Sequence, residues 1–85
     1  MNFQLVYTKR ALKDIQKLDK RSKTRIKNAL EVYSLNPYSH LEKLTNYVIG
    51  SYRFRIGNYR VIFDIEENQI IVLRVGHRKD IYKGK

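Results

Sequence analysis

Three arginines in the middle of the chain are the residues best suited to chemistry. Arg53, Arg55 and Arg60 lie in two alternating runs on either side of Gly57-Asn58, a pair typical of a tight β-hairpin turn. With that turn, Arg55 faces Arg60 across the hairpin and Arg53 shares their face. A like-charged cross-strand pair costs a few tenths to about 1 kcal/mol. Guanidinium is always charged and suited to phosphate, so the cluster predicts an anion-binding site.

The end of the chain adds a second group of candidates. His77, Arg78 and Tyr82 follow directly after a strand that ends at Gly76. Histidine titrates near neutral pH, and a tyrosine ring can stack on a nucleobase. Together with the arginines, these side chains could bind a phosphodiester and stabilise a charged transition state. Structural roles stay open: His77 as an ordinary residue after a strand, and Tyr82 as a contact that holds the C-terminus on the sheet.

RNA is the substrate that needs least from such a set of residues, because it carries its own nucleophile. A protein can cleave RNA without a metal by orienting the 2′-hydroxyl in line with the phosphate, neutralising the phosphorane and supplying a proton to the leaving oxygen. The sequence has no glycine-rich phosphate loop, no Ser or Cys nucleophile motif and no metal-binding cluster. His40 stands alone and is expected to be a loop histidine. We therefore expect no cofactor and no metal.

Composition agrees with an anionic partner. The 85 residues include 18 Lys and Arg against 8 Asp and Glu, for a net charge of +10. Such a charge favours nucleic acid, an anionic membrane or an acidic protein, although it could also be a lysine-rich solubilising surface. No apolar run reaches the ~18 residues of a membrane span, and the N-terminus lacks the features of a signal peptide. With no cysteine in the chain, a cytoplasmic protein is expected.

The N-terminal half predicts a strand followed by two helices. Residues 2–7 alternate as a strand does, and Thr8 is a suitable N-cap. Apolar residues at helical spacing predict helices from about Lys9 to Asp19 and from about Lys20 or Arg21 to Leu35, where Pro37 prevents continuation. The connection between these helices is short, so they should pack as an antiparallel hairpin.

The C-terminal half predicts the sheet. Residues 37–51 read as a loop anchored in the core by Leu41, Leu44 and Val48. The hairpin follows, and its inner face should pair Ile56 with Tyr59 and place these apolar residues together: Tyr52, Phe54, Ile56, Tyr59, Val61 and Phe63. Residues 70–75 are apolar at consecutive positions and predict a strand buried on both faces. The face on which Arg74 lies depends on a register that the sequence leaves open.

These elements predict a single domain over residues 1–85, of the α+β class. Their order is β-α-α-β-β-β, an antiparallel sheet with the helical hairpin on one face.

Two motifs make the chain similar to a known superfamily. Gly57-Asn58-Tyr59-Arg60 and Gly76-His77-Arg78-x-x-x-Tyr82 resemble the RelE/ParE superfamily of type II toxins, and the RelE type most of all. The N-terminal run from Val6 to Leu18 is similar as well, so the likeness covers nearly the whole chain. It implies a RelE-like microbial RNase fold. It also implies a ribosome-dependent endoribonuclease that cuts mRNA and blocks translation, silenced by a cognate antitoxin in a hetero-oligomeric complex.

The resemblance also assigns roles to residues. Arg60 matches the arginine that stabilises the transition-state phosphate, Arg78 the residue that assists the leaving group, and Tyr82 the tyrosine that stacks on the base. Arg53 and Arg55 stand where RelE toxins carry lysines, and arginine cannot serve as a base. Either His77 or ribosomal RNA then supplies the base, or positioning and electrostatics suffice. The expected substrate-binding residues are Arg53, Arg55, Lys79 and Tyr82.

Two alternatives stay open. ParE-type members of the same superfamily inhibit DNA gyrase and cut no RNA. A non-catalytic or inactivated RNA-binding homologue would also fit a chain with arginines in place of lysines.

Overall fold

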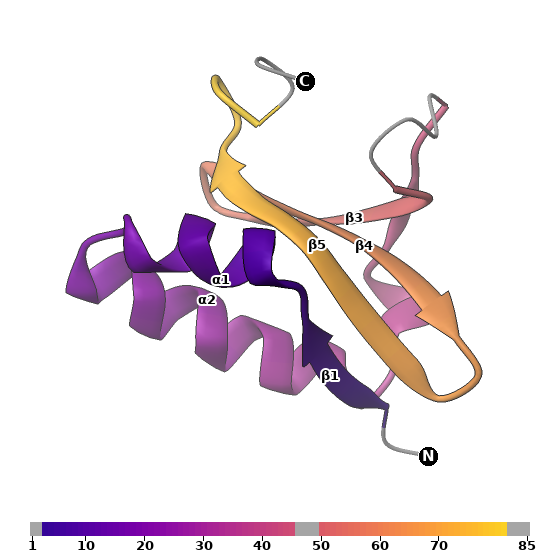
Figure 1. Cartoon of the computed structure of the whole chain (residues 1–85). Coiled ribbons are helices and arrows are strands. Elements are labelled where there is room, and N and C mark those ends of the chain that lie inside the picture. Colours follow the sequence, from indigo (N-terminus) through magenta and orange to yellow (C-terminus); the bar gives the residue numbers. More distant parts are fainter. Residues whose placement is uncertain (1–2, 46–49, 82–85) are drawn as a thin grey trace.

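The protein folds into a mixed sheet with two helices on one of its faces (Figure 1). The computed structural model describes residues 3–45 and 50–81. The strand order in the five-stranded sheet is β1-β5-β4-β3-β2. The elements follow one another along the chain as β1 (Gln4–Tyr7), α1 (Lys9–Gln16), α2 (Lys20–Tyr33), a 3₁₀ turn (Pro37–Ser39), β2 (Glu42–Lys43), β3 (Tyr52–Ile56), β4 (Tyr59–Glu66) and β5 (Gln69–His77). The predicted α+β class and its helical hairpin are confirmed.

The direction of β1 refines that prediction. β1 pairs with β5 in parallel, with Leu5 opposite Ile70, whereas the other strand pairs are antiparallel. Alternating hydrophobicity reveals that a strand exists and which of its faces is buried. The alternation is the same for a parallel and an antiparallel strand, so it does not reveal the strand's direction. The sheet is therefore mixed, and β5 lies between β1 and β4 as an interior strand.

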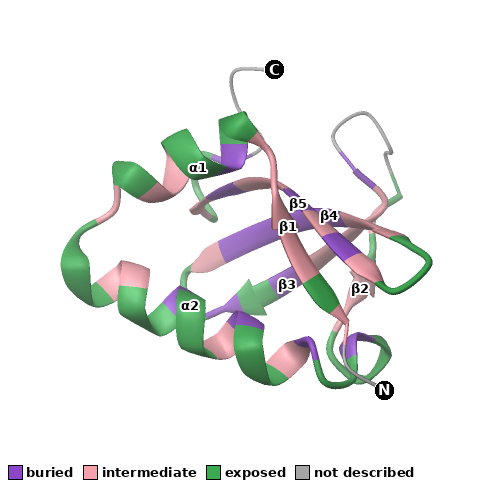
Figure 2. Ribbon diagram, turned by 60° about the horizontal axis from the view of Figure 1, so that its bottom comes forward, coloured by how far each residue is buried: buried purple, intermediate pink, exposed green. Residues whose placement is uncertain are grey.

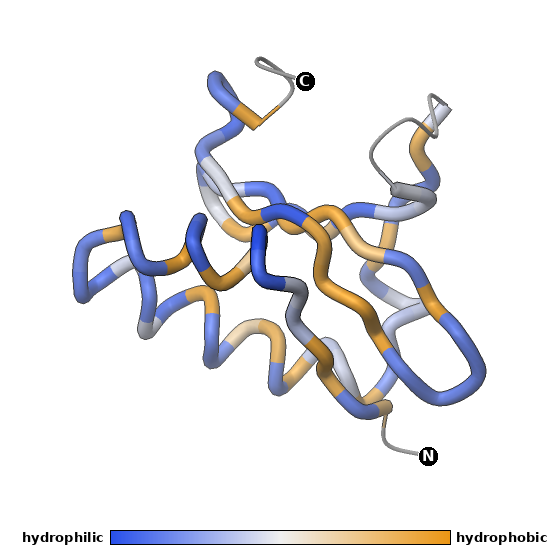
Figure 3. Tube along the Cα trace, viewed as in Figure 1, coloured by the Kyte–Doolittle hydropathy of each residue, from blue (hydrophilic) through white to orange (hydrophobic). Residues whose placement is uncertain are grey.

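The β3–β4 hairpin has the predicted register. Ile56 lies opposite Tyr59 and Arg55 opposite Arg60, around a turn in which Gly57 has a φ of 60°. Its inner face carries Phe54 and Phe63, both fully buried and stacked with ring centroids 4.2 Å apart. Buried residues concentrate on the strands and on the inner sides of the helices, while the outer helix surfaces are exposed (Figure 2). The hydropathy of the chain follows the same division, with the central strands apolar (Figure 3).

Both helices are shorter than predicted at their C-terminal ends. α1 begins as expected, with the Thr8 hydroxyl accepting a hydrogen bond from the Ala11 N–H at 3.1 Å. It ends at Gln16 because the next backbone N–H groups bond to carbonyls three residues back, as Leu18 does to Ile15. After α2 the same pattern begins one residue later, because the N–H groups of Leu35 and Asn36 bond to the carbonyls of Val32 and Tyr33. This 3₁₀ pattern tightens the last turn and is common at helix ends.

The segment expected to be a loop contains the short strand β2. Glu42 and Lys43 pair with Arg53 and Tyr52 of β3, so β2 extends the sheet at its edge. Leu41 packs against the core as predicted and Leu44 is half-buried. Val48 lies outside the described residues. Two residues are too few for alternation to reveal a strand.

A β-bulge interrupts the pairing of β4 with β5. Phe63 pairs with Val72, but Ile62 pairs with Arg74, so Leu73 is the extra residue on β5. Val72 is fully buried against the helices, whereas Leu73 is half-buried on the other face. The predicted burial of this strand on both faces is thus met only in part, because none of the helices in residues 3–45 and 50–81 covers the second face (Figure 1). We call this uncovered side the open face.

No helix in the described part of the chain is long and apolar enough to cross a membrane.

Candidate active site

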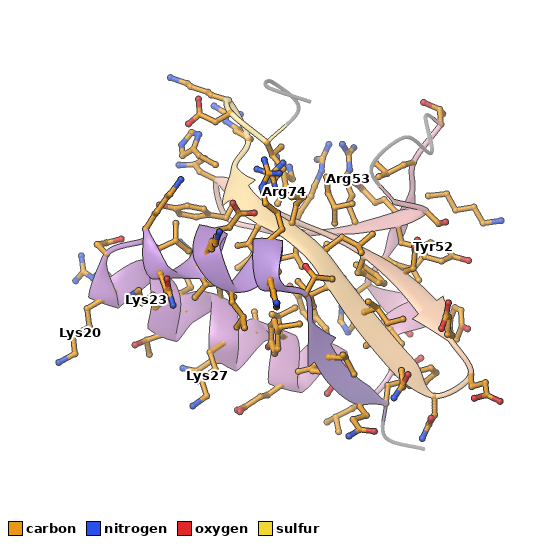
Figure 4. The ribbon with its side chains drawn as sticks, viewed as in Figure 1. Lys20, Lys23, Lys27, Tyr52, Arg53 and Arg74 are labelled. Carbon is orange, nitrogen blue, oxygen red and sulfur yellow. The ribbon has the colours of Figure 1, made fainter. Side chains whose placement is uncertain are left out.

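The three arginines of the hairpin lie together on the open face. Alternation along each strand puts Arg53, Arg55 and Arg60 on the side opposite the buried Phe54 and Val61. The paired residues Arg55 and Arg60 have Cβ atoms only about 4.5–5.5 Å apart. Arg53 extends away from the helices into this face (Figure 4). The structure therefore brings together the charged cluster that the sequence predicted.

Glu42 supplies a carboxylate in the midst of these arginines. Its Oε1 lies 2.7 Å from Nε of Arg53 and 3.2 Å from Nε of Arg55. The hydrogen bond from Arg53 lowers the pKa of Glu42, and the positive charges of Arg53, Arg55 and Arg60 lower that pKa further. The Glu42 side chain is 42% exposed, so solvent screens these pairs and makes them easy to break.

Arg60 is held by the turn of its own hairpin. Its Nη1 donates to the carbonyl oxygens of Gly57 at 3.0 Å and Tyr59 at 2.9 Å. Only 9% of the residue is exposed. An arginine fixed by backbone carbonyls has little rotamer freedom left to lose when a ligand binds, so Arg60 is a preorganised cation.

A further arginine, Arg74, is bound to helix α1. Its Nε donates to Oδ2 of Asp14 at 2.7 Å, and the same oxygen accepts the Val75 N–H at 3.0 Å. Side-chain exposure is 19% for Arg74 and 11% for Asp14. Asp14 thus accepts a hydrogen bond from the Val75 N–H, in the part of β5 that extends past the end of β1. Arg74, like Arg53, extends from the side of the sheet away from α2 (Figure 4).

His77 lies on the other face of the sheet. It pairs with Tyr59, and their rings meet edge to face with centroids 5.6 Å apart. Tyr59 packs against the core on the helix side, while its neighbour Arg60 has the opposite orientation. The Nδ1 atom of His77 accepts the Lys79 N–H at 3.1 Å. The structure therefore does not bring His77 to the face that carries Arg60.

The remaining predicted residues follow β5. The Arg78 N–H donates to the Asn58 carbonyl at 2.7 Å, and the Arg78 and Lys79 residues are exposed. The chain then folds back so that Ile81 covers Gly76, where a Cβ would lie 3.1 Å from Ile81 Cδ1. Gly76 is the cross-strand partner of Arg60. Tyr82 lies outside the described residues.

Sequence reasoning missed Glu42 and Arg74. The sequence predicts a loop at Glu42, although three like charges on one sheet face are themselves a signal that a counter-charge lies near. Arg74 could not be placed because its face depends on the bulge at Leu73. Among residues 3–45 and 50–81, no group of three or more His, Cys, Asp or Glu side chains gathers as metal ligands do.

Two helices on one face of a five-stranded sheet, with a cationic face opposite, define a small basic α+β protein of the kind found among bacterial and archaeal toxins. Residues 5–82 match the family model described as ParE toxin of the type II toxin–antitoxin system parDE. The chain belongs to this family and is thus a toxin of the RelE/ParE superfamily, as the sequence motifs indicated.

Individual relatives agree with this assignment. The chain is 33% identical to Toxin RelE3 of Methanocaldococcus jannaschii over 84 residues, which cover 93% of this chain and 94% of the relative. It is 30% identical to Toxin RelG of Mycobacterium tuberculosis over 86 residues, covering 98% and 99% of the two chains. The toxin–antitoxin complex RelBE2 of M. tuberculosis has a chain that superposes with a TM-score of 0.82 at 26% identity, covering 92% of this chain and all of that one.

Proposed function

We propose that this toxin is an endoribonuclease that cuts mRNA on the ribosome by in-line attack of the RNA 2′-hydroxyl, without a metal. The observation that carries the proposal is the arginine cluster of the open face, with Arg60 preorganised and Glu42 within reach of Arg53 and Arg55. Clustering of like charges is unfavourable, and the single carboxylate of Glu42 offsets only part of the charge of three arginines, so a further anion would stabilise the cluster. A phosphodiester has the matching charge and geometry. Action on ribosomes implies a cytoplasmic protein.

Arg60 is the residue that stabilises the transition state. The reaction forms a bond from O2′ to phosphorus and breaks the bond to O5′, passing through a phosphorane with extra negative charge. A cation already fixed by two carbonyls stabilises that charge without reorganising during the reaction. Arg53 and Arg55 bind the same phosphate and orient it. Arg78 neutralises the leaving oxygen, which takes its proton from water.

Glu42 is the group that accepts the 2′-hydroxyl proton. Arginine cannot do so, and His77 faces the helices. The surrounding guanidiniums hold the pKa of Glu42 low in the free protein, which makes it a weak base. A bound phosphate takes over those guanidiniums and adds a negative charge. Both changes raise the pKa of Glu42, so substrate binding itself strengthens the base.

Cleavage in cells tests this proposal. Primer extension on a reporter mRNA after brief induction should show cuts that require translation, and Arg60→Ala should abolish them. Arg10→Ala is the matched control, since it removes the same charge from an exposed site on α1. Full cutting by a folded Arg60→Ala protein would overturn the assignment. A reporter that lacks its ribosome-binding site should stay uncut.

Inhibition of DNA gyrase is the second candidate, favoured by the match to the ParE model. Growth arrest without mRNA cuts, together with loss of supercoiling by purified gyrase, would establish it.

The partner that silences this toxin should be an acidic antitoxin segment that folds on binding. Similar solved structures are the toxin–antitoxin complexes RelBE2 and RelB–RelE. A hollow of about 280 Å³ between α1, α2 and β1 is lined by apolar side chains and two lysines, and offers such a segment both contacts it needs. Its lining residues are Tyr7, Leu12, Ile15, Lys23, Ile26, Lys27 and Leu30. Burial and the negative charge of Glu31 raise the pKa of Tyr7, so it stays neutral there.

A further inference from the structure

A second cavity lies beyond the arginine cluster, where the end of β5 meets helix α1. It measures about 320 Å³, close to the lower limit for small-molecule sites, and is therefore large enough for one heterocycle. α1 contributes Asp14 and Lys17, β4 contributes Tyr59, and β5 with the following turn contributes His77 and Asp80. The mechanism above uses none of these five side chains.

The cavity opens next to the open face. Gly76 and Arg74 both line it. Gly76 pairs with Arg60, and Cα atoms in such a pair are about 4.5–5.5 Å apart. A nucleotide whose phosphate contacts the arginine cluster therefore has a base within reach of the cavity.

The cavity walls suit a base in particular. The rings of Tyr59 and His77 meet at 76° and form an aromatic corner, a surface on which heterocycles pack. The orientation of His77 is fixed, because its Nδ1 accepts the Lys79 N–H. The neutral ring then carries its proton on Nε2, so that atom is a donor. Asp14 is not free to read a base, since Oδ2 already accepts from Arg74 and Val75.

Asp80 is the acceptor that remains. The carbonyl of His77 accepts the N–H groups of Asp80 at 2.8 Å and Ile81 at 2.9 Å, and this turn holds Asp80 at the cavity. The tight contact of Ile81 with Gly76 fixes the same turn against the sheet. The cavity thus presents a carboxylate and an imidazole N–H from one rigid segment.

We propose that this cavity binds a guanine base of the RNA substrate, a proposal that rests on the endoribonuclease function above. Among the four RNA bases, guanine alone presents an oxygen acceptor beside two neighbouring N–H donors on its Watson–Crick edge. One carboxylate accepts from both donors, and one N–H donates to the oxygen. Asp80 selects the base, His77 bonds to its O6, and Tyr59 packs on its ring. Recognition of the base is thereby separated from the arginines that act on the phosphate.

Nucleotide binding tests the cavity without any need for cleavage. Isotope-labelled protein is titrated with GMP, AMP, CMP and UMP while amide shifts are recorded. GMP should bind at least about fivefold more tightly than the other three, as one good bidentate contact provides, and should shift the amides of Gly76, His77 and Asp80. Asp80→Asn should bring the four affinities together. Glu66→Gln, the same charge change at the exposed far end of β4, should leave the GMP preference intact.

The outcomes separate the two proposals. If the wild type cuts mRNA but binds all four nucleotides equally, or if Asp80→Asn keeps the preference for GMP, the guanine cavity is refuted and the nuclease stands. If the wild type binds GMP at these amides yet cuts no mRNA, the nuclease fails and the cavity stands. In cleavage maps, Asp80→Asn should lose the preference for guanine next to the cut.

Discussion

Arg60→Ala tests whether the central arginine also stabilises the fold. Two carbonyls of the hairpin turn accept hydrogen bonds from Arg60 Nη1, and the residue is 9% exposed. Hydrogen bonds to charged groups contribute about 1.5–3 kcal/mol. The truncation also relieves repulsion with Arg55 across the hairpin, which returns about 0.2–1 kcal/mol. The free energy of unfolding should therefore fall by about 0.5–3 kcal/mol.

Thermal unfolding followed by circular dichroism measures this loss. In a domain of this size each kcal/mol shifts Tm by about 4–8 °C, so Tm should fall by roughly 2–24 °C. Native domains have about 5–15 kcal/mol of stability, so the variant stays folded at 25 °C and its loss of cleavage can be interpreted.

Arg55→Ala is the matched control within the same cluster. Arg55 is 58% exposed, and its ion pair with Glu42 is worth little. Its removal ends the same repulsion without leaving a turn carbonyl unpaired, so Tm should stay constant or rise slightly. Equal Tm values for Arg60→Ala and the wild type, or an equal fall in both variants, would refute the view that the turn carbonyls hold Arg60.

Three further predictions concern Glu42 and the hollow between the helices. Glu42→Gln should lower cleavage by about 10²–10⁴-fold, the range for a lost general base. Because the folded pKa of Glu42 is lowered, its stabilisation is present above the unfolded pKa of about 4.3 and is lost as pH falls through the folded value. The free energies of unfolding of wild type and Glu42→Gln, measured in urea, should thus differ at pH 7 by about 0.2–1 kcal/mol and converge in strong acid; a constant gap would contradict this. Leu12→Asp should weaken binding of the proposed acidic antitoxin at least tenfold by calorimetry, whereas Val32→Asp, equally charged and outside the hollow, should not.

The hairpin could be predicted from the sequence because its pairing rules are local. A two-residue turn fixes the register, and the register fixes both the apolar face and the positions of Arg53, Arg55 and Arg60. The direction of β1 could not be read in this way. It depends on a partner more than sixty residues away, and alternation carries no sign of strand direction.

The position of His77 shows where local rules end. If β4 and β5 kept the register of the Glu66–Gln69 pair along their whole length, His77 would lie opposite Asn58. Its side chain would then be on the same face of the sheet as Arg60. The extra residue Leu73 shifts the register by one, so Tyr59 faces His77 and the imidazole lies on the helix side. No turn residue marks this bulge in the sequence. One inserted position thus removes a histidine from the arginine cluster and supplies one to the cavity beside α1.

The two carboxylates that pair with open-face arginines differ in exposure, and this difference assigns their roles. The Asp14 side chain is 11% exposed and holds Arg74 together with a backbone N–H, so separating that pair leaves groups buried without partners. Glu42 is 42% exposed, and water readily replaces its contacts with Arg53 and Arg55. An incoming phosphate can therefore displace Glu42 but not Asp14. In the proposed mechanism, Arg74 stays a structural cation that joins α1 to β5, while the hairpin arginines are released to bind RNA at the moment when Glu42 becomes free to accept a proton.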